Sequence, residues 1–289
     1  MTAYRFCRSD DLGLLAEAHE RCRGSEDEAA PALDRARLKE LIRELDLWSS
    51  SCMVALEGSE PVGVLLGCKR DTATLVYALR VHPEHRRRGH ARHLLTSLSS
   101  KLAILGPPRL VAEVPAHRPA ALALFDACGW RREEQLVDWQ RSATPPPAET
   151  IAPAEEQFAS ISVEEALASG LLAPAANGWR RDPASFERQA DRLTCLGFYS
   201  ADRLEAVVVG RAPHARRGAL EVLALGSTDT DLGRLSLRLL LAELERSADG
   251  TTLLVPCVSP VELEATPLFE LFFRPGGEHV RFATEAESA

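Results

Sequence analysis

The stretch LVYALRVHPEHRRRGHARHLLTSLSSKLAIL, residues 75–105, decides how the rest of the chain is interpreted. Its first part is apolar and β-branched in patches, and Pro83 cannot donate to a strand ladder, which predicts a strand over residues 72–82. From Gly89 onward the apolar residues recur at helical spacing, and a Gly-Pro-Pro stop follows. The pattern therefore predicts a helix over residues 89–105.

The turn between this strand and this helix has the features of an anion site. The first N–H groups of a helix have no internal partner and carry the positive end of its dipole. Gly89 and Ala91 leave the backbone open to close approach because both are small. Arg86, Arg87 and Arg88 add permanent charges whose forked donors suit phosphate oxygens. The turn thus indicates a phosphate site, and the alternative is an ordinary solvated basic loop.

The string VHPEHRRRGHA, residues 81–91, resembles the acetyl-CoA pyrophosphate loop of the GNAT acetyltransferases. The pattern of that loop is Arg or Gln, two residues, Gly, one residue, and Gly or Ala, after a strand. The resemblance implies that backbone N–H groups of residues 87–91 hold the pyrophosphate and that the strand before them holds the pantetheine arm. It assigns acetyl-CoA binding to these residues: Leu79, Val81, Arg86, Arg87, Arg88, Gly89, His90 and Ala91.

Length and composition set outer bounds on the protein. A chain of 289 residues predicts two domains, and a hydrophobic share of 45% is enough for a core in each. The sequence shows no leader-like start and no apolar run long enough for a membrane span, so we expect a soluble, cytoplasmic protein. Seven scattered cysteines, never in CxxC spacing, argue against a disulfide framework and against a zinc site.

Charge is shared unevenly between the two halves. Residues 1–141 carry a net charge of +1 and residues 142–289 a net charge of −9. Nucleic acid is therefore an unlikely partner. The acidic half would attract a cationic acceptor, although solubility alone accounts for such a charge.

The first half follows the order of elements found in one GNAT domain. We expect that domain over residues 1–141, and the GNAT resemblance places the acceptor pocket between its first two helices, where Glu26, Asp27 and Glu28 could meet an amine. The predicted strands cover residues 3–7, 52–57, 62–69, 72–82, 109–114 and 130–140, and the predicted helices cover residues 12–22, 32–47, 89–105 and 119–128.

A proline-rich linker is predicted over residues 142–153, and a second GNAT-like domain over residues 154–289. Its predicted strands cover residues 195–200, 205–211, 219–225, 251–258 and 279–282, and its predicted helices cover residues 183–194, 232–246 and 265–273. In place of arginines, its loop at residues 226–231 reads GSTDTD, whose carboxylates would repel phosphates. We therefore expect a degenerate copy that holds no acetyl-CoA.

Acetyl transfer needs a place for the proton of the amine and a way to stabilise the leaving thiolate. Glu113 matches the general base in the branch of the family that acetylates the N-terminus of ribosomal proteins, or it is a structural carboxylate paired with an arginine. Phe125 stands where that branch has the tyrosine acid, and a phenyl ring cannot donate a proton. Arg118 stands where a cofactor-contacting Asn is expected. Tyr77, His117 and Cys128 are other candidate acids.

Four histidines, His82, His85, His90 and His93, lie within the same stretch. Their spacing fits no zinc pattern, and the arginines among them disfavour a dication, so no metal site is predicted.

The sequence therefore predicts an α/β (α+β) chain of two GNAT-like domains, each with a mixed, mostly antiparallel sheet flanked by helices. The function that the resemblance implies is transfer of an acetyl group from acetyl-CoA to a primary amine, of a small molecule or peptide, in the N-terminal domain. The alternative is a non-catalytic acyl-CoA-binding or assembly protein with the same fold. Acetyl-CoA is the expected cosubstrate, and the protein is expected to be a monomer or homodimer with no nucleic-acid or membrane partner.

Overall fold

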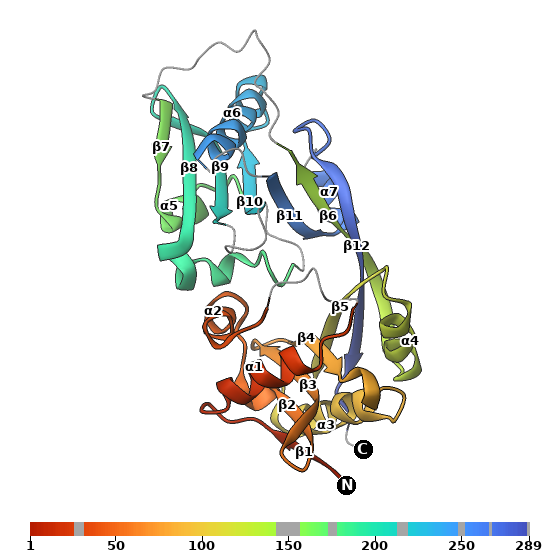
Figure 1. Ribbon diagram of the computed structural model, residues 1–289. Coiled ribbons are helices and arrows are strands. Elements are labelled where there is room, and N and C mark those ends of the chain that lie inside the picture. Colours follow the sequence, from red (N-terminus) through yellow and green to blue (C-terminus); the bar gives the residue numbers. More distant parts are fainter. Residues whose placement is uncertain are drawn as a thin grey trace. The chain divides into compact units, whose positions relative to one another are not determined.

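The structure is a computed structural model that describes residues 1–25, 32–142, 157–172, 178–212, 219–247, 252–265 and 268–287. The chain forms two compact units, Met1–Glu134 with His279–Ala289 and Gln135–Glu278 (Figure 1). Both unit boundaries fall inside strands, because β6 (Arg131–Arg141) and β12 (Arg274–Glu285) each contribute residues to both units.

The first unit is built on a mixed sheet in the order β1-β2-β3-β4-β5-β12. All neighbours in it are antiparallel except β4 and β5, which are parallel. Besides β12, its strands are β1 (Thr2–Phe6), β2 (Met53–Glu57), β3 (Glu60–Lys69), β4 (Thr74–Val81) and β5 (Arg109–Pro115).

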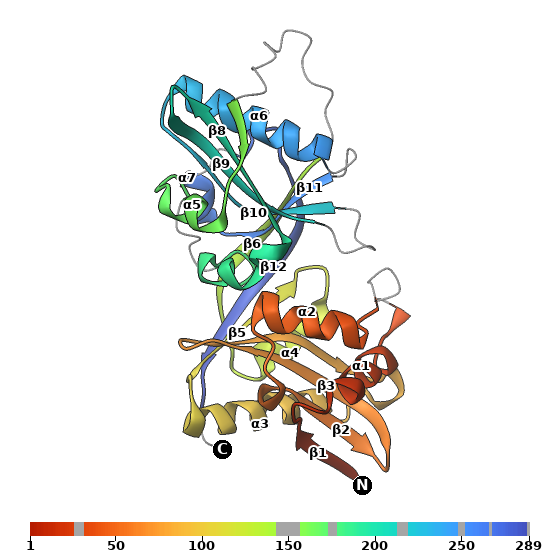
Figure 2. The same cartoon turned by 90° about the vertical axis from the view of Figure 1, so that its left-hand side faces the viewer.

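Helices cover both faces of this sheet (Figures 1 and 2). The first two are α1 (Leu12–Arg21) and α2 (Arg35–Leu45), and the other two are α3 (His90–Leu105) and α4 (Pro119–Ala127). Leu94, Leu98 and Leu102 of α3 and Phe125 of α4 share a buried cluster with Leu110 of β5. These leucines are three and four positions apart, so the helical periodicity seen in the sequence is the face that packs.

The last strand of the first unit comes from the C-terminus of the chain. Residues 279–285 of β12 pair with residues 109–115 of β5 in antiparallel register, from His279 opposite Pro115 to Glu285 opposite Arg109. Phe282 is fully buried in the cluster under α3 and α4. The two units therefore follow other boundaries than the predicted domains, 1–141 and 154–289.

The second unit has the strand order β6-β11-β10-β9-β8-β7. Residues 137–141 of β6 pair with β11, so this strand, expected to close the first domain, lies against a strand of the second unit. The other strands are β7 (Phe158–Ser160), β8 (Leu193–Ser200), β9 (Arg203–Arg211), β10 (Ala219–Ser227) and β11 (Thr252–Val258), and the helices are α5 (Val163–Ala168), α6 (Asp231–Ser247) and α7 (Pro260–Ala265).

Two predicted helices of the second half are wrong in type or position. Residues 183–194 form two 3-10 helices, η5 (Pro183–Ser185) and η6 (Glu187–Arg192), because Asp182 and Ser185 bond neighbouring backbone in tight turns. The helix predicted over residues 265–273 is replaced by the earlier α7, and Phe272 has a left-handed φ of 65° that a helix does not allow.

The other predicted strands and helices are found in the structure, and some predicted segments fall outside the described residues. The fold class is confirmed, and the strands and helices predicted for the first half are found within a few residues of the expected bounds. The elements β7 and α5 were not predicted. Residues 143–153 of the predicted linker, residues 154–156 after it, and residues 26–31, which include Glu26, Asp27 and Glu28 of the acidic loop, lie outside the described residues. No helix within the described ranges combines the length and the apolar character needed to cross a lipid bilayer.

Candidate functional site: the splayed strand β4 and the start of helix α3

Strand β4 separates from β5 before it reaches the basic loop. The two strands pair only at Thr74 with Leu110 and at Leu75 with Val111. On its other side β4 stays paired with β3 as far as Val81, with a bulge that shifts the register at Leu66. A bulge bends a strand and increases its twist, which accounts for the separation. The end of β4 thus has one edge turned away from β3 and unpaired with β5.

The backbone of Leu79 and Val81 faces this unpaired edge. The N–H of His82 donates to the carbonyl of Val62 on β3 at 3.0 Å. Because N–H groups alternate between the two edges of a strand, those of Val81 and Leu79 point away from β3. Both residues are half-buried, so an extended ligand lying along this edge would be partly shielded from water.

The loop after β4 turns its backbone through two left-handed residues. Arg87 has a φ of 64° and Gly89, the residue before α3, has a φ of 88°. A non-glycine residue with such a φ costs about 1–2 kcal/mol and marks a backbone held in place by its surroundings. Left-handed residues next to ordinary ones turn successive N–H groups toward one side, which makes an anion-binding concavity.

The start of α3 is open. No side chain within the described ranges caps the helix at Gly89, and a Cβ built on Gly89 meets no atom within 4 Å. The first N–H groups of the helix therefore face free space, into which their partial positive charge extends. Arg86, Arg87 and Arg88 are exposed around it. The local chemistry is that of a site for a phosphate or pyrophosphate.

His90, the first residue of α3, is only 6% exposed. Its Nδ1 lies 2.6 Å from the hydroxyl of Tyr4 in β1, and the ring of His93 lies 3.8 Å from the Tyr4 ring. Burial lowers the pKa of the His90 imidazole. His90 therefore contributes a backbone N–H to the open helix end, while its side chain anchors the loop to β1. Ala91 follows it, half-buried in the same turn.

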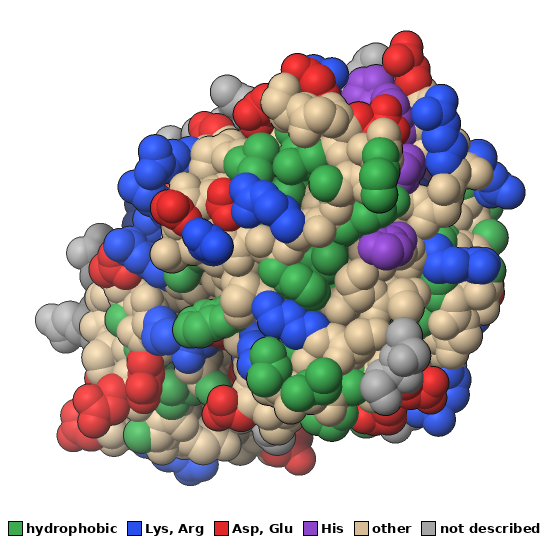
Figure 3. All heavy atoms as spheres, turned by 90° about the horizontal axis from the view of Figure 1, so that it is seen from below, with side chains coloured by type: hydrophobic (Ala, Val, Ile, Leu, Met, Phe, Trp, Pro, Cys, Tyr) green, Lys and Arg blue, Asp and Glu red, His purple; other side chains and the backbone are tan. Residues whose placement is uncertain are grey.

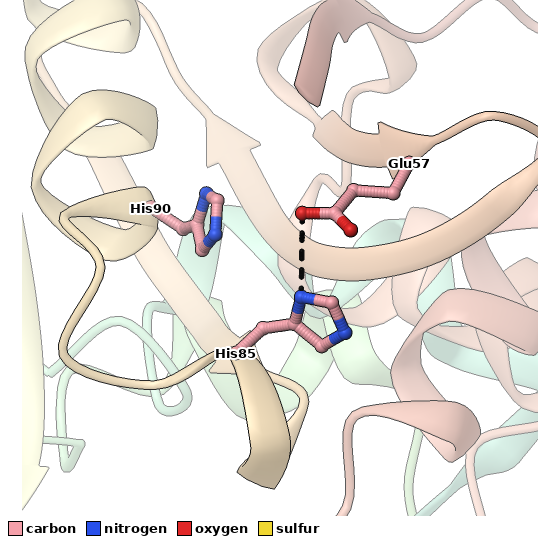
Figure 4. Close-up of side chains that lie close together, drawn as sticks. All are labelled: Glu57, His85 and His90. Carbon is pink, nitrogen blue, oxygen red and sulfur yellow. Dashed lines mark ion pairs between the residues drawn. The ribbon is translucent and has the colours of Figure 1, made fainter. Parts of the chain in front are cut away.

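A carboxylate that sequence reasoning missed also lies beside this loop. Glu57 at the end of β2 pairs with His85, Oε1 to Nδ1, at 3.4 Å, and His90 faces the same pair (Figure 4). The hydroxyl of Thr2 donates to Glu57 and is the main reason why the pKa of this carboxyl is lowered. Histidine side chains lie beside acidic and basic side chains on the face drawn in Figure 3.

Glu113, the predicted base, is held in an ion pair. Its Oε1 accepts a hydrogen bond from the guanidinium of Arg281 at 3.1 Å, and the same guanidinium pairs with Glu134. The side chains of Glu113 and Arg281 are 9% and 5% exposed. Arg281 belongs to β12, so a partner 168 positions away decides the surroundings of Glu113. No sequence spacing signals such a pair. Pairing of Glu113 with an unidentified arginine was one of the two alternatives that the sequence left open, and the structure shows that this arginine is Arg281.

Phe125 is a core residue. It is 4% exposed, meets Trp130 edge to face at 4.9 Å and stacks on Phe282 at 5.3 Å between ring centroids. Arg118, which stands in place of the expected Asn, is the last residue before α4. Of the candidate acids, His117 is exposed, and Tyr77 and Cys128 are half-buried.

The start of helix α6, the equivalent position in the second unit, is capped by a side chain. Between β10 and α6, the hydroxyl of Thr230 accepts a hydrogen bond from the N–H of Gly233 at 2.9 Å, which caps the helix. Arg234 pairs with Asp229 at 2.9 Å and with Asp231 at 2.8 Å. The start of α6 thus has a side-chain cap from Thr230, whereas α3 has no side-chain cap among the described residues.

Comparison with known proteins agrees with these features. Residues 15–130 match the Acetyltransferase (GNAT) family. An acetyltransferase of Photorhabdus laumondii is 30% identical over 135 residues, which cover 46% of this chain and 90% of that protein. An acetyltransferase of Sodalis glossinidius is 27% identical over 133 residues, covering 46% of this chain and 89% of that protein.

Two solved structures resemble the chain over nearly its whole length. A tandem GNAT protein from the clavulanic acid biosynthesis pathway has a TM-score of 0.67 at 17% identity, covering 100% of both chains. A GCN5-related N-acetyltransferase from Sphaerobacter thermophilus has a TM-score of 0.62 at 14% identity, covering 99% of this chain and 96% of the other. The chain therefore belongs to the GNAT acetyltransferase family and has a tandem GNAT fold.

Proposed function

We propose that the first unit binds acetyl-CoA and transfers its acetyl group to the primary amine of a small molecule or peptide. The observation that carries this proposal is the open start of α3, where Arg87 and Gly89 turn the backbone toward free space among three exposed arginines. The pyrophosphate would accept hydrogen bonds from the backbone of residues 87–91. Arg86 and Arg88 would add charge-assisted contacts.

The unpaired edge of β4 supports the other half of cofactor binding. The pantetheine arm carries amide groups that bond to a backbone as a strand does. Leu79 and Val81 present their N–H groups to that edge, and β5 no longer competes for them. The thioester would then lie between β4 and β5, on the side of the sheet where Glu113 is found.

Glu113 is the proposed base, acting on the attacking amine directly or through a water. Arg281 contacts Oε1 and holds the carboxylate in one orientation. A fixed geometry is what proton transfer requires, because the acceptor atom must lie within hydrogen-bond reach of the amine.

A second candidate function is favoured by the surroundings of Glu113 and Phe125. The carboxylate of Glu113 is already paired and the Phe125 ring lies in the core, which together leave the site without an evident acid. Loss of a general acid costs about 100-fold to 10,000-fold in rate. The chain would then be an acyl-CoA-binding or assembly protein that keeps the loop without turnover.

Release of free thiol from acetyl-CoA separates the two functions. The intact chain is assayed with amino acids, polyamines, aminoglycosides and peptides that carry a free N-terminus or a lysine. Amine-dependent thiol release that is lost in Arg86→Glu/Arg88→Glu supports the enzyme, with Arg131→Glu, an exposed arginine at the start of β6, as the matched control. Cofactor binding without thiol release from any amine supports the second function.

We further propose that the second unit holds no acetyl-CoA. Its carboxylates at the start of α6 would repel the pyrophosphate, and the Thr230 cap occupies an N–H that the phosphate would need. We also propose that the protein works in the cytoplasm as a monomer or homodimer.

A further inference from the structure

Three side chains from three separate elements point toward one another beside the basic loop. Glu57 ends β2, His85 ends the short 3-10 helix η3 (Pro83–His85), and His90 begins α3. One carboxylate oxygen and one ring nitrogen from each histidine all lie within 4.8 Å of one another (Figure 4). Donor atoms bound to one zinc ion at about 2 Å lie about 3–4 Å apart. The three groups are therefore close to a metal-binding arrangement before any ion is present.

One buried nitrogen at this cluster lacks a partner. The Nε2 of His90 has no hydrogen bond among the described residues, whereas the Nδ1 of His85 faces Glu57 in the ion pair at 3.4 Å. His90 as a whole is only 6% exposed to solvent. A buried polar atom without a partner costs about 1–3 kcal/mol, so such atoms are rare unless they have a further role. A metal ion at the cluster supplies the missing partner.

The groups behind the cluster also match a metal site. Tyr4 contacts the Nδ1 of His90 at 2.6 Å, and Thr2 donates to Glu57 at 3.1 Å. When the Nδ1–H of His90 donates to the Tyr4 oxygen, the lone pair of Nε2 is free to bind a metal. Such outer hydrogen bonds orient metal ligands and select the tautomer of a histidine.

We propose that Glu57, His85 and His90 bind one divalent transition-metal ion of the zinc class. Two imidazoles and one carboxylate suit such an ion, and three protein ligands leave a fourth position for water. The ion would join the end of β2 to the two ends of the loop between β4 and α3. The histidine spacing alone does not reveal the site, because the third ligand lies 28 positions before His85.

The nearby arginines do not prevent binding. Arg86, Arg87 and Arg88 are exposed, so water and salt screen their charges, whereas His90 is buried. The carboxylate of Glu57 offsets part of the charge of the ion at direct contact.

The test is zinc titration of the intact chain by calorimetry, with metal content of the dialysed protein as a second readout. We expect one zinc ion per chain, with binding at least tenfold weaker in Glu57→Gln and in His85→Gln. His117→Gln is the matched control, because His117 is an exposed histidine outside the cluster. The zinc affinity of this variant should equal that of the wild type. Tyr4→Phe should weaken binding about 10-fold to 100-fold through His90.

The absorption spectrum of bound Co²⁺ distinguishes metal binding at this cluster from metal binding by a cysteine. The Co²⁺-loaded chain should show ligand-field bands without thiolate charge-transfer absorption, and Glu57→Gln should alter those bands. Equal zinc affinity in the wild type, Glu57→Gln and His85→Gln overturns the proposal, as does a thiolate band. Absence of zinc binding by the wild type overturns it too. Circular dichroism of each variant shows whether it is folded.

Discussion

At the scale of single residues, the proposed cofactor site depends on two backbone conformations. Arg87 and Gly89 both have positive φ, and between them they turn the chain from β4 into α3. The sequence motif identified Gly89 as a position where the backbone can be approached closely. It did not predict the left-handed arginine, because nothing in the residue type favours that conformation.

Gly89→Ala should lower the free energy of unfolding by about 1 kcal/mol, because alanine is strained at a φ of 88°. Its Cβ has space, so the loss comes from backbone strain and not from a clash. The melting temperature should fall by about 2–4 °C. Gly13→Ala is the control: Gly13 lies in α1 with open space around it, and the change should stabilise by about 0.5 kcal/mol. Equal melting temperatures for both variants would contradict this account of the loop.

The thiols of the native protein should differ sharply in reactivity. Burial raises the pKa of Cys7 and of Cys52 to about 12, and that of Cys22 and of Cys195 to about 11. Because the thiolate is the reactive form, these groups should be inert at pH 8. Titration with a chromogenic disulfide should label Cys128, which is half-buried, and reach seven thiols only after denaturation. Any fast-reacting thiol in Cys128→Ser would disagree with the burial found here.

Contacts between residues far apart in sequence explain what could not be predicted at this scale. Arg281 meets Glu113 across the pairing of β12 with β5, and Glu57 at the end of β2 meets His85 of the 3-10 helix η3, and no local pattern encodes either contact. Phe125 was recognised as unable to donate a proton, and the structure adds that its ring is packed in the core.

At the scale of elements, α3 was predicted well because it has one long apolar face, and β4 because it is an apolar run, β-branched in patches, that ends before Pro83. Periodicity is less informative elsewhere. It failed for residues 183–194, where side chains of Asp182 and Ser185 compete for the backbone and produce 3-10 turns. It also failed at α7, which is only six residues long.

The ion pair between β6 and α6 makes the stability of the second unit depend on pH. Burial raises the pKa of Glu245, and Arg141, 2.9 Å away, opposes that rise only in part. The folded state therefore holds the Glu245 proton more tightly than the unfolded state. Its contribution to stability is fully present below the usual glutamic acid pKa of about 4.3 and is lost as pH rises through the raised value.

Glu245→Gln removes this titration. The stability of the wild type relative to this variant should therefore fall as pH rises above about 4.3, in urea unfolding followed by tryptophan fluorescence. Glu164→Gln, at an exposed position of α5, serves as the matched control. A relative stability that rises with pH would show that the attraction of Arg141 outweighs burial.

At the scale of the whole molecule, the first unit is not a continuous segment of the chain, because Gln135–Glu278, which forms the second unit, lies between its two parts in sequence. The order of elements predicted two similar halves, but it could not show that residues 279–285 complete the sheet of the first unit. Strand partners depend on tertiary structure, and two strands of similar apolar pattern fit either place by sequence alone.

Residues 1–141 alone should therefore fail to fold stably. Removing Phe282 from the core costs about 3–5 kcal/mol, and removing Arg281 leaves buried Glu113 unpaired at about the same cost. The sum approaches the 5–15 kcal/mol that stabilises a typical domain. Fusing residues 279–289 to this fragment through a flexible linker of about 20 residues should restore a cooperative melt. A cooperative melt for residues 1–141 without that strand would contradict the division into units.

The measurement that tests the central claim most directly is titration of the intact chain with acetyl-CoA by calorimetry. The account predicts one site per chain, lost in Arg86→Glu/Arg88→Glu and kept in Arg131→Glu, because the site is the loop before α3 and the start of α6 is closed by its own side chains. Two sites per chain, no binding, or binding that survives the double charge reversal would contradict it.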